Sequence, residues 1–237
     1  MRQQLRSSKT VNLETRHDIK LELDVRCQKL IEKQLLAAFP EIGLLGEEGD
    51  SETAHAELRW VVDPIDGTVN FAYGIPHACV SIALQHKRAR GYETIVGVVY
   101  EPFSDELWTA VRGEQARLNG KFIHVSKRDK LAEAIVSTGF AKSRENLERA
   151  LPYFQWLARR VRKVRIMGSA ALSLAYVASG RFDAYVERGV NLWDIAAGGL
   201  IVECAGGKFW HELVPGGRKY RLIVSNRLLH RKLPIPK

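Results

Sequence analysis

The sequence has few features of a secreted, membrane or zinc-thiolate protein. It contains no run of about 18 apolar residues, so we expect no membrane-spanning helix. The first ten residues, MRQQLRSSKT, lack the apolar segment of a secretory signal. The three cysteines, Cys27, Cys79 and Cys204, are far apart, which excludes a dense disulfide framework and the usual zinc spacings. Reduced cysteines and the missing signal together predict a cytoplasmic protein.

The composition is that of a globular chain. Apolar residues make up 46% and aromatic residues 8% of the 237 residues, which are ordinary values. A chain of this length can bury a sizeable core as one domain. We therefore predict a single domain over 1–237, with approximate halves at 1–130 and 131–237.

Positive charge is in excess, with a formal net charge of +9, and it is unevenly spread. Five of the seven residues at 159–165 are basic, and residues 208–237 contain eight Lys or Arg against one Glu. Such patches are compatible with nucleic-acid binding. The sequence favours a solvated basic face that attracts anionic substrates, because no helix-turn-helix or aromatic-interleaved pattern accompanies the charge. A nucleic-acid partner stays open but is not favoured.

Periodicity and turn signals predict a mixture of helices and strands. Helices are expected over 22–39, 143–160, 169–179 and 192–204. Strands are expected at 60–62, 79–85, 94–100, 106–111, 134–138, 164–167, 182–186, 208–210 and 220–224, with a hairpin at Asn119-Gly120. Early strands follow one another directly, and later ones alternate with helices. This order predicts an α+β or α/β fold with mixed sheets and helix layers.

The segment 60–71, WVVDPIDGTVNF, carries the strongest functional signal. Pro64 and Gly67 predict that the strand ends there and turns. Asp63 and Asp66 would then converge at the strand exit, and oxygen ligands of this kind suit Mg²⁺ before Ca²⁺ or Mn²⁺. The alternative is an ordinary turn in which both aspartates only cap backbone amides. Acidic residues at three further places, Glu47, Asp194 and Asp24, favour the metal site.

Four segments, taken together, resemble the inositol monophosphatase family of Mg²⁺-dependent, lithium-sensitive sugar phosphatases. They are GEEG at 46–49, WVVDPIDGTVNF at 60–71, GSAA at 168–171 and DAYVERGVNLWDIAAGGLIVECAGG at 183–207. Their order and spacing agree with the family over roughly residues 18–226. The resemblance implies a layered αβαβα sandwich of the inositol monophosphatase and fructose-1,6-bisphosphatase type, and a homodimer.

The resemblance also implies roles for particular residues. Two to three Mg²⁺ ions are expected, with Glu47, Asp63 and the Ile65 carbonyl holding the first and Asp63, Asp66 and Asp194 the second. The expected catalytic residues are Glu47, which faces the activated water, and Thr68 with its partner Asp24. The substrate-binding residues are expected to be Asp66, Gly67, Thr68, Gly168, Ser169, Ala170, Glu187 and Asp194.

The implied function is hydrolysis of a small polyol phosphate. Glu187 matches the carboxylate that binds an inositol hydroxyl, so inositol 1-phosphate is the first candidate. Fructose 1,6-bisphosphate, phosphoadenosine phosphate and histidinol phosphate remain alternatives. An alternative of another class is a member that binds RNA or a transcription complex and has little activity, although a pure binding module has no need of these carboxylates. Two departures are Leu21, where the family commonly has threonine, and a start that leaves out most of the usual first helix.

Overall fold

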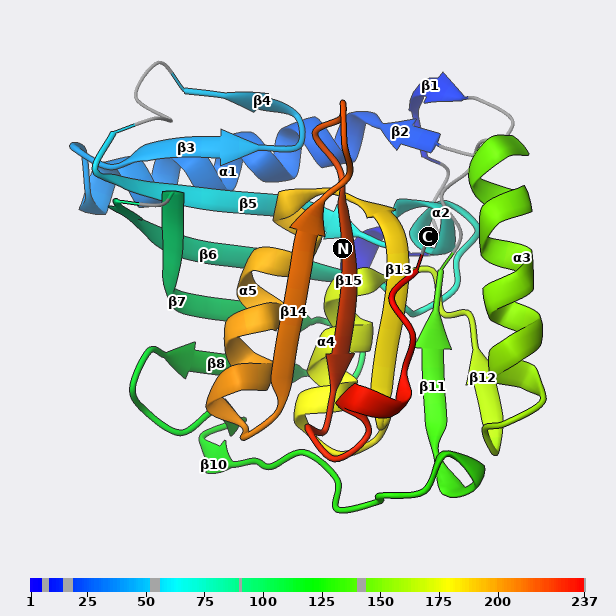
Figure 1. Ribbon diagram of the computed structural model, residues 1–237. Helices are drawn as coiled ribbons and strands as arrows, with labels where there is room; N and C mark the ends of the chain where they lie inside the picture. The colour runs from blue at the N-terminus through cyan, green and yellow to red at the C-terminus, as the bar shows by residue number, and fades with distance from the viewer. Residues whose placement is uncertain (6–8, 15–18, 52–55, 90, 140–143, 237) are drawn as a thin grey trace.

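The computed structural model describes residues 1–5, 9–14, 19–51, 56–89, 91–139 and 144–236 (Figure 1). The first half forms an eight-stranded sheet of order β10-β9-β8-β7-β6-β5-β3-β4. Its strands are β3 Gly43–Gly46, β4 Gly49–Asp50, β5 Leu58–Asp66, β6 Cys79–Arg88, β7 Gly91–Glu101, β8 Glu106–Val111, β9 Arg117–Leu118 and β10 Lys121–Phe122. A separate antiparallel pair, β1 Val11–Glu14 and β2 Ile19–Leu21, precedes this sheet.

The second half forms a five-stranded sheet of order β12-β11-β13-β15-β14. Its strands are β11 Ile135–Thr138, β12 Lys163–Arg165, β13 Ala184–Val190, β14 Lys208–Leu213 and β15 Tyr220–Ser225. The helices of the chain are α1 Glu22–Ala38, α2 Thr68–Ala72, α3 Arg144–Ala158, α4 Ala170–Ala178 and α5 Leu192–Cys204. The chain passes from the first sheet to the second between β10 and β11, and the single domain divided near residue 130 stays a prediction.

The helices and sheets stack in five layers, which confirms the α+β layered architecture expected from the sequence (Figure 1). Helix α1 packs on β3 and β5 at the outer face of the first sheet, through residues such as Leu35 against Trp60. Helices α4 and α5 lie between the sheets and form the main core with both. Helix α3 covers the other face of the second sheet, where Leu157 packs with Val136 and Ile223. Both faces of the second sheet are apolar because successive side chains of a strand point to opposite faces. In β15, Leu222 belongs to the core with α4 and α5, and its neighbour Ile223 belongs to the core with α3.

Strand β5 differs from the sequence prediction. The strand was expected to end at Pro64, but it continues to Asp66. Pairing with β6 shifts here, because Asp63 pairs with Ser81 whereas Asp66 pairs with Cys79. Three steps along β5 therefore oppose two along β6, which is a β-bulge. A bulge is one of the few places where a strand tolerates proline, so the strand continues instead of turning.

Other predicted elements agree with the structure within a few residues. Helix α5 has the predicted bounds of 192–204, and the Asn119-Gly120 turn joins the antiparallel strands β9 and β10. Strands β7, β13 and β14 extend beyond their predicted ends. Helix α3 begins at Arg144, and the first residue predicted for it, 143, lies outside the described residues. In the part of the chain that the structure describes, no helix has the length and apolarity needed to cross a bilayer.

Candidate active site

The predicted site residues gather around one cleft of about 620 Å³. The first half contributes Glu47 and the β5–α2 segment from Asp63 to Asn70. The second half contributes the start of α4, the end of β13 and the start of α5. Of the predicted residues, those that line the cleft are Glu47, Asp63, Ile65, Asp66, Gly67, Thr68, Gly168, Ser169, Ala170, Glu187 and Asp194. Asp24 is not among the described residues that line it.

The bulge in β5 determines how Asp63 and Asp66 are placed. In a regular strand, residues three apart point to opposite faces of the sheet. The one extra residue of the bulge reverses this alternation, so both carboxylates face the same cleft. Both side chains are buried, and Asp63 Oδ1 accepts a hydrogen bond of 3.0 Å from the Ile65 amide. The convergence predicted from the sequence is therefore produced by a bulge rather than by a strand exit.

Strand pairing places Glu47 beside Asp63. Strand β3 is parallel to β5, with Gly46 opposite Val62, so the next residue of each segment lies side by side. The Glu47 amide donates to the Val62 carbonyl oxygen at 3.2 Å, which continues this pairing beyond the end of β3. The short hairpin from β3 to β4 thus positions the Glu47 carboxylate at the rim of the same cleft.

Asp66 links the two halves of the molecule. Its carboxylate accepts hydrogen bonds from Ser169 Oγ at 2.5 Å, from the Ala171 amide at 2.7 Å and from the Ala170 amide at 3.3 Å. These donors belong to the N-terminus of α4, where a negative charge is favoured by free amides and by the helix dipole. Ser169 also caps α4 by accepting a bond from the Leu172 amide, as its predicted place at the helix start requires.

Asp194 occupies the first turn of α5. Its Oδ2 accepts a 2.7 Å hydrogen bond from the amide of Asn191, the N-cap residue. This arrangement is the reciprocal capping of a helix start, and it holds the carboxylate at a position favoured by the helix dipole. The hydrogen bond between Asn191 and Asp194 therefore does two things: it caps the start of α5, and it fixes the carboxylate of the predicted metal ligand Asp194.

Burial and mutual repulsion make these carboxylates costly to ionise. Burial raises the pKa of Asp63 well above its usual value, and the charges of Glu47, Asp66 and Asp194 raise it further. The pKa of Asp194 is also well above its usual value, mainly through burial and the charge of Asp66. Burial raises the pKa of Asp66 as well, although the hydrogen bonds from Ser169, Ala171 and Ala170 oppose that effect. A cluster of this kind is stabilised when cations neutralise it.

The oxygen donors fit hard divalent cations. Among the described residues, no group of three or more His, Cys, Asp or Glu side chains is already arranged to hold a metal ion. Mg²⁺ does not need such a cage, because it commonly takes one or two carboxylates and completes its shell with waters and substrate phosphates. Glu47, Asp63, Asp66, Asp194 and the Ile65 carbonyl supply oxygen atoms only, which suits Mg²⁺ and gives no soft ligand for zinc.

Thr68 and Asp24 make contacts different from the predicted pairing. The Thr68 hydroxyl donates its proton to the Ile65 carbonyl oxygen at 2.9 Å. Asp24, in the first turn of α1, accepts a 2.8 Å bond from the Leu21 amide. Leu21 and Ile65 belong to one buried cluster, so the start of α1 lies behind the end of β5. The Asp24–Thr68 partnership stays a prediction, and it requires the threonine hydroxyl to turn away from Ile65.

Backbone geometry explains Gly67. This residue has φ +95°, a left-handed conformation that favours glycine. A Cβ there would also lie 2.9 Å from the His77 carbonyl oxygen. Gly67 caps the short helix α2, so its backbone and that of Thr68 face the cleft without a side chain in between.

Glu187 projects from β13 at the other side of the cleft. The Tyr185 hydroxyl donates a hydrogen bond to its Oε2. Its carboxylate packs directly on Gly139, where a Cβ would approach Oε2 to 1.9 Å. Tyr185 and Gly139 therefore fix Glu187 in one orientation, as a substrate-binding carboxylate requires.

Sequence reasoning missed several cleft residues. Asn70 donates to the carbonyl oxygens of His77 at 2.9 Å and Met167 at 2.8 Å, which ties α2 to the segment before α4. Among the described residues that line the cleft, Lys219 is the one with a positively charged side chain. It precedes β15, and only the folding of the β14–β15 hairpin over the cleft brings it there. No local sequence signal predicts such a position.

Comparison with known proteins gives consistent matches. The family model described as the inositol monophosphatase family matches residues 1–232. The Nus factor SuhB of Xylella fastidiosa is 43% identical over 194 residues, which cover 81% of this chain and 69% of that protein. The inositol-1-monophosphatase of Rhizobium meliloti is 41% identical over 214 residues, which cover 88% of this chain and 77% of that protein.

Solved structures share the fold. The extragenic suppressor protein suhB from Bartonella henselae has a TM-score of 0.87 and 34% identity, and the match covers 98% of this chain and 88% of that one. An IMPase/NADP phosphatase complexed with Mg²⁺ and phosphate has a TM-score of 0.82 and 27% identity, covering 98% of this chain and 87% of that one. Fold, acidic cleft and family model define a phosphatase of the inositol monophosphatase superfamily. The chain belongs to the inositol monophosphatase family.

Proposed function

We propose that this protein is a Mg²⁺-dependent phosphomonoesterase that hydrolyses a small polyol phosphate, with inositol 1-phosphate as the first substrate. The observation that carries the proposal is the gathering of four acidic side chains from three segments in one cleft, which a fifth, Glu187, also lines. The four are suited to cations, which would in turn bind phosphate, and Glu187 is suited to a hydroxyl group. A relative named inositol-1-monophosphatase and a similar structure complexed with Mg²⁺ and phosphate support this assignment.

The residues would divide the work as follows. Glu47, Asp63, Asp66 and Asp194 would hold two to three Mg²⁺ ions, which when bound neutralise phosphate oxygens, acidify a water ligand and stabilise the leaving oxygen. Glu47 would accept a proton from the attacking water. The open backbone at Gly67 and Thr68 would receive the phosphate.

Substrate recognition would fall to the second half. Glu187 would accept a hydrogen bond from a polyol hydroxyl, in the orientation that Tyr185 gives it. Gly168 and Ala170 would form the adjoining wall, while Ser169 keeps Asp66 in place. A hydroxyl bound to the half-buried Glu187 carboxylate would be recognised, because its loss leaves the carboxylate without that hydrogen bond.

Phosphate release from a panel of sugar and nucleotide phosphates, measured with Mg²⁺ and with EDTA, tests the proposal. Inositol 1-phosphate should give the highest kcat/KM, and EDTA should abolish turnover. A higher kcat/KM for fructose 1,6-bisphosphate, phosphoadenosine phosphate or histidinol phosphate would reassign the substrate. Turnover that survives EDTA would contradict the proposed chemistry. The expected homodimer stays a prediction, which light scattering of the purified protein would test.

The name of one relative, Nus factor SuhB, favours a second candidate function in a transcription complex. The net charge of +9 suits contact with nucleic acid. Salt-dependent RNA binding by a protein without phosphatase activity would favour this second function over the first. Phosphatase activity without measurable RNA binding at physiological salt would leave the first function alone.

A further inference from the structure

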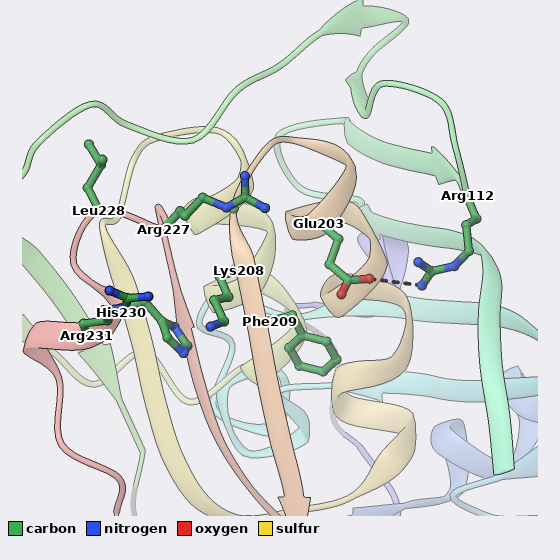
Figure 2. A pocket seen from close by; sticks show the side chains of 9 residues that line it. Arg112, Glu203, Lys208, Phe209, Arg227, Leu228, His230 and Arg231 are labelled. Carbon is green, nitrogen blue, oxygen red and sulfur yellow. Dashed lines mark hydrogen bonds and ion pairs between the residues drawn. The ribbon is translucent and has the colours of Figure 1, made fainter. Parts of the chain in front are cut away.

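A second cavity, of about 740 Å³, lies at the edge of the second sheet, where β14 begins. Its lining consists of Gly207 and the eight residues labelled in Figure 2, which are Arg112, Glu203, Lys208, Phe209, Arg227, Leu228, His230 and Arg231. None of these nine residues lines the active-site cleft. Its volume falls in the usual range for small-molecule sites. We call this cavity the basic pocket.

Positive charge dominates the basic pocket. Arg112, Lys208, Arg227 and Arg231 face a single carboxylate, Glu203. That carboxylate already has an ion pair, because Arg112 Nη2 lies 3.0 Å from Glu203 Oε2 (Figure 2), and Arg112 Nε also lies 3.3 Å from Glu93 Oε1. Within the described part of the chain, Lys208, Arg227 and Arg231 form no ion pair. Three cations from two separate segments therefore remain available to an anionic ligand.

The loop that carries Arg227 is held in a strained form. Arg227 has φ +71°, a left-handed conformation that is unfavourable for a residue with a side chain. The residues on either side of the exposed pair Arg227-Leu228 are buried anchors. Asn226 donates to Ser126 Oγ at 2.9 Å and to the Arg128 carbonyl oxygen at 2.7 Å, and Leu229 is fully buried. These anchors impose the strained backbone, and strain kept in this way is typical of functional positions.

The strained loop directs Arg227 toward the start of β14. In Figure 2 the Arg227 guanidinium lies over the region between Lys208 and Glu203. Lys208 also acts on His230, whose pKa is lowered by burial and then by the lysine's charge. The cations on β14 and on the 227–231 segment are therefore close enough to act on one ligand. Phe209 adds an apolar wall on the side of α5.

We propose that the basic pocket binds a small molecule carrying at least two negative charges on phosphate groups. Guanidinium groups match the geometry of phosphate oxygens, and their charge-assisted hydrogen bonds are strong. A compact ligand is favoured over a nucleic-acid strand by the distribution of charge. The other dense basic segment, 159–165, leads into β12, at the opposite edge of the sheet from β14. The proposal does not depend on the function assigned to the active-site cleft.

Calorimetric titration of the full chain with inorganic pyrophosphate tests the proposal, both with Mg²⁺ and after EDTA treatment. The EDTA arm isolates the basic pocket, because metal-free carboxylates in the active-site cleft repel anions. The pocket variant is Lys208→Gln with Arg227→Gly, and glycine suits the left-handed backbone at 227, so the loop keeps its shape. The control variant is Arg159→Gln with Arg165→Gln, which removes the same charge from the opposite edge.

The pocket variant should bind pyrophosphate at least ~10-fold more weakly than wild type, and the control variant within about 2-fold of wild type. Phosphatase activity should match wild type in both variants, and neither variant should melt at a lower temperature than wild type. Three results would overturn the proposal. They are a wild-type Kd above ~1 mM, equal losses of affinity in the two variants, or a short single-stranded RNA that binds through Lys208 and Arg227 more tightly than pyrophosphate.

Discussion

Removing a buried charge from the active-site cleft should strengthen the metal-free fold while destroying activity. The test compares Asp63→Asn with Asp66→Asn, two isosteric changes three residues apart. Asp63 is 2% exposed, and burial and then neighbouring carboxylates raise its pKa well above the usual value. Its one described hydrogen bond comes from the Ile65 amide, which an asparagine oxygen can still accept. The substitution therefore removes repulsion and keeps the hydrogen bond.

Proton linkage determines whether Asp63 stabilises or destabilises the metal-free protein. A carboxyl group whose folded pKa lies above its unfolded value binds more protons in the folded state, so stability falls as pH rises between the two values. At neutral pH, which lies above the unfolded pKa, Asp63 therefore weakens the metal-free protein. One like charge at about 7 Å costs ~2 kcal/mol at an effective dielectric of 20. At about 2–4 °C per kcal/mol for a chain of this size, Asp63→Asn should raise the melting temperature in EDTA by ~4–8 °C.

Asp66→Asn should act in the opposite direction. Its two oxygens accept bonds from Ser169 Oγ and from the amides of Ala170 and Ala171, all of which are donors. An amide group presents a donor on one side, so at least one of these groups loses its acceptor. The loss costs ~1–3 kcal/mol per group, and more for a bond to a charged acceptor. At about 2–4 °C per kcal/mol, the melting temperature in EDTA should fall by ~2–12 °C.

Thermal unfolding followed by circular dichroism measures both effects, at neutral pH and at pH values near the unfolded pKa of about 4. The gain from Asp63→Asn should shrink as pH falls, since the wild-type group is then protonated. Mg²⁺ should raise the melting temperature of wild type more than that of either variant. Shifts of the same sign in both variants, or no gain for Asp63→Asn in EDTA, would refute the reasoning.

Further outcomes are expected from activity measurements. Asp194→Asn should lower kcat by at least ~10³, because a lost ligand removes several kcal/mol of charge stabilisation, and Ca²⁺ should bind without supporting turnover. Glu187→Gln should reduce kcat/KM for inositol 1-phosphate by ~1–3 kcal/mol more than for glycerol 2-phosphate, and equal losses would make Glu187 structural. Thr68→Ser should keep most activity while Thr68→Ala loses ~10²–10⁴-fold. An active Thr68→Ala enzyme would exclude a role for the hydroxyl.

Local signals were sufficient for much of the fold. Helix α5 could be bounded from an apolar run between Asn191, which caps its start, and Gly206-Gly207, which follow its end. The β9–β10 hairpin could be predicted from Asn119-Gly120 alone, because Asn119 and Gly120 both adopt the positive φ that such a turn requires. In these places the residues that determine the structure are neighbours in the chain.

Pairing between distant segments could not be predicted in the same way. The sequence shows Pro64 but not the pairing of Asp63 with Ser81 and of Asp66 with Cys79, so it could not distinguish a bulge from a strand end. Lys219 enters the cleft only because the β14–β15 hairpin reaches it, and the basic pocket requires Arg112 and Arg227 from segments far apart. These features depend on tertiary structure, which no short window of sequence contains.

Asp66 shows why the stability and the activity of this protein are tied together. The carboxylate belongs to the first half, yet every described backbone amide that it bonds belongs to α4 in the second half. The same group that cations would neutralise therefore also holds the two halves at the distance that forms the cleft. Several hydrogen bonds to Asp66 oppose the rise in its pKa that burial causes. Asp63 and Asp194 each have one such bond, so the rise in their pKa is opposed less. Asp66 can thus keep the cleft assembled through these hydrogen bonds before any cation arrives, while the raised pKa of Asp66, Asp63 and Asp194 means that all three carboxylates gain from bound cations.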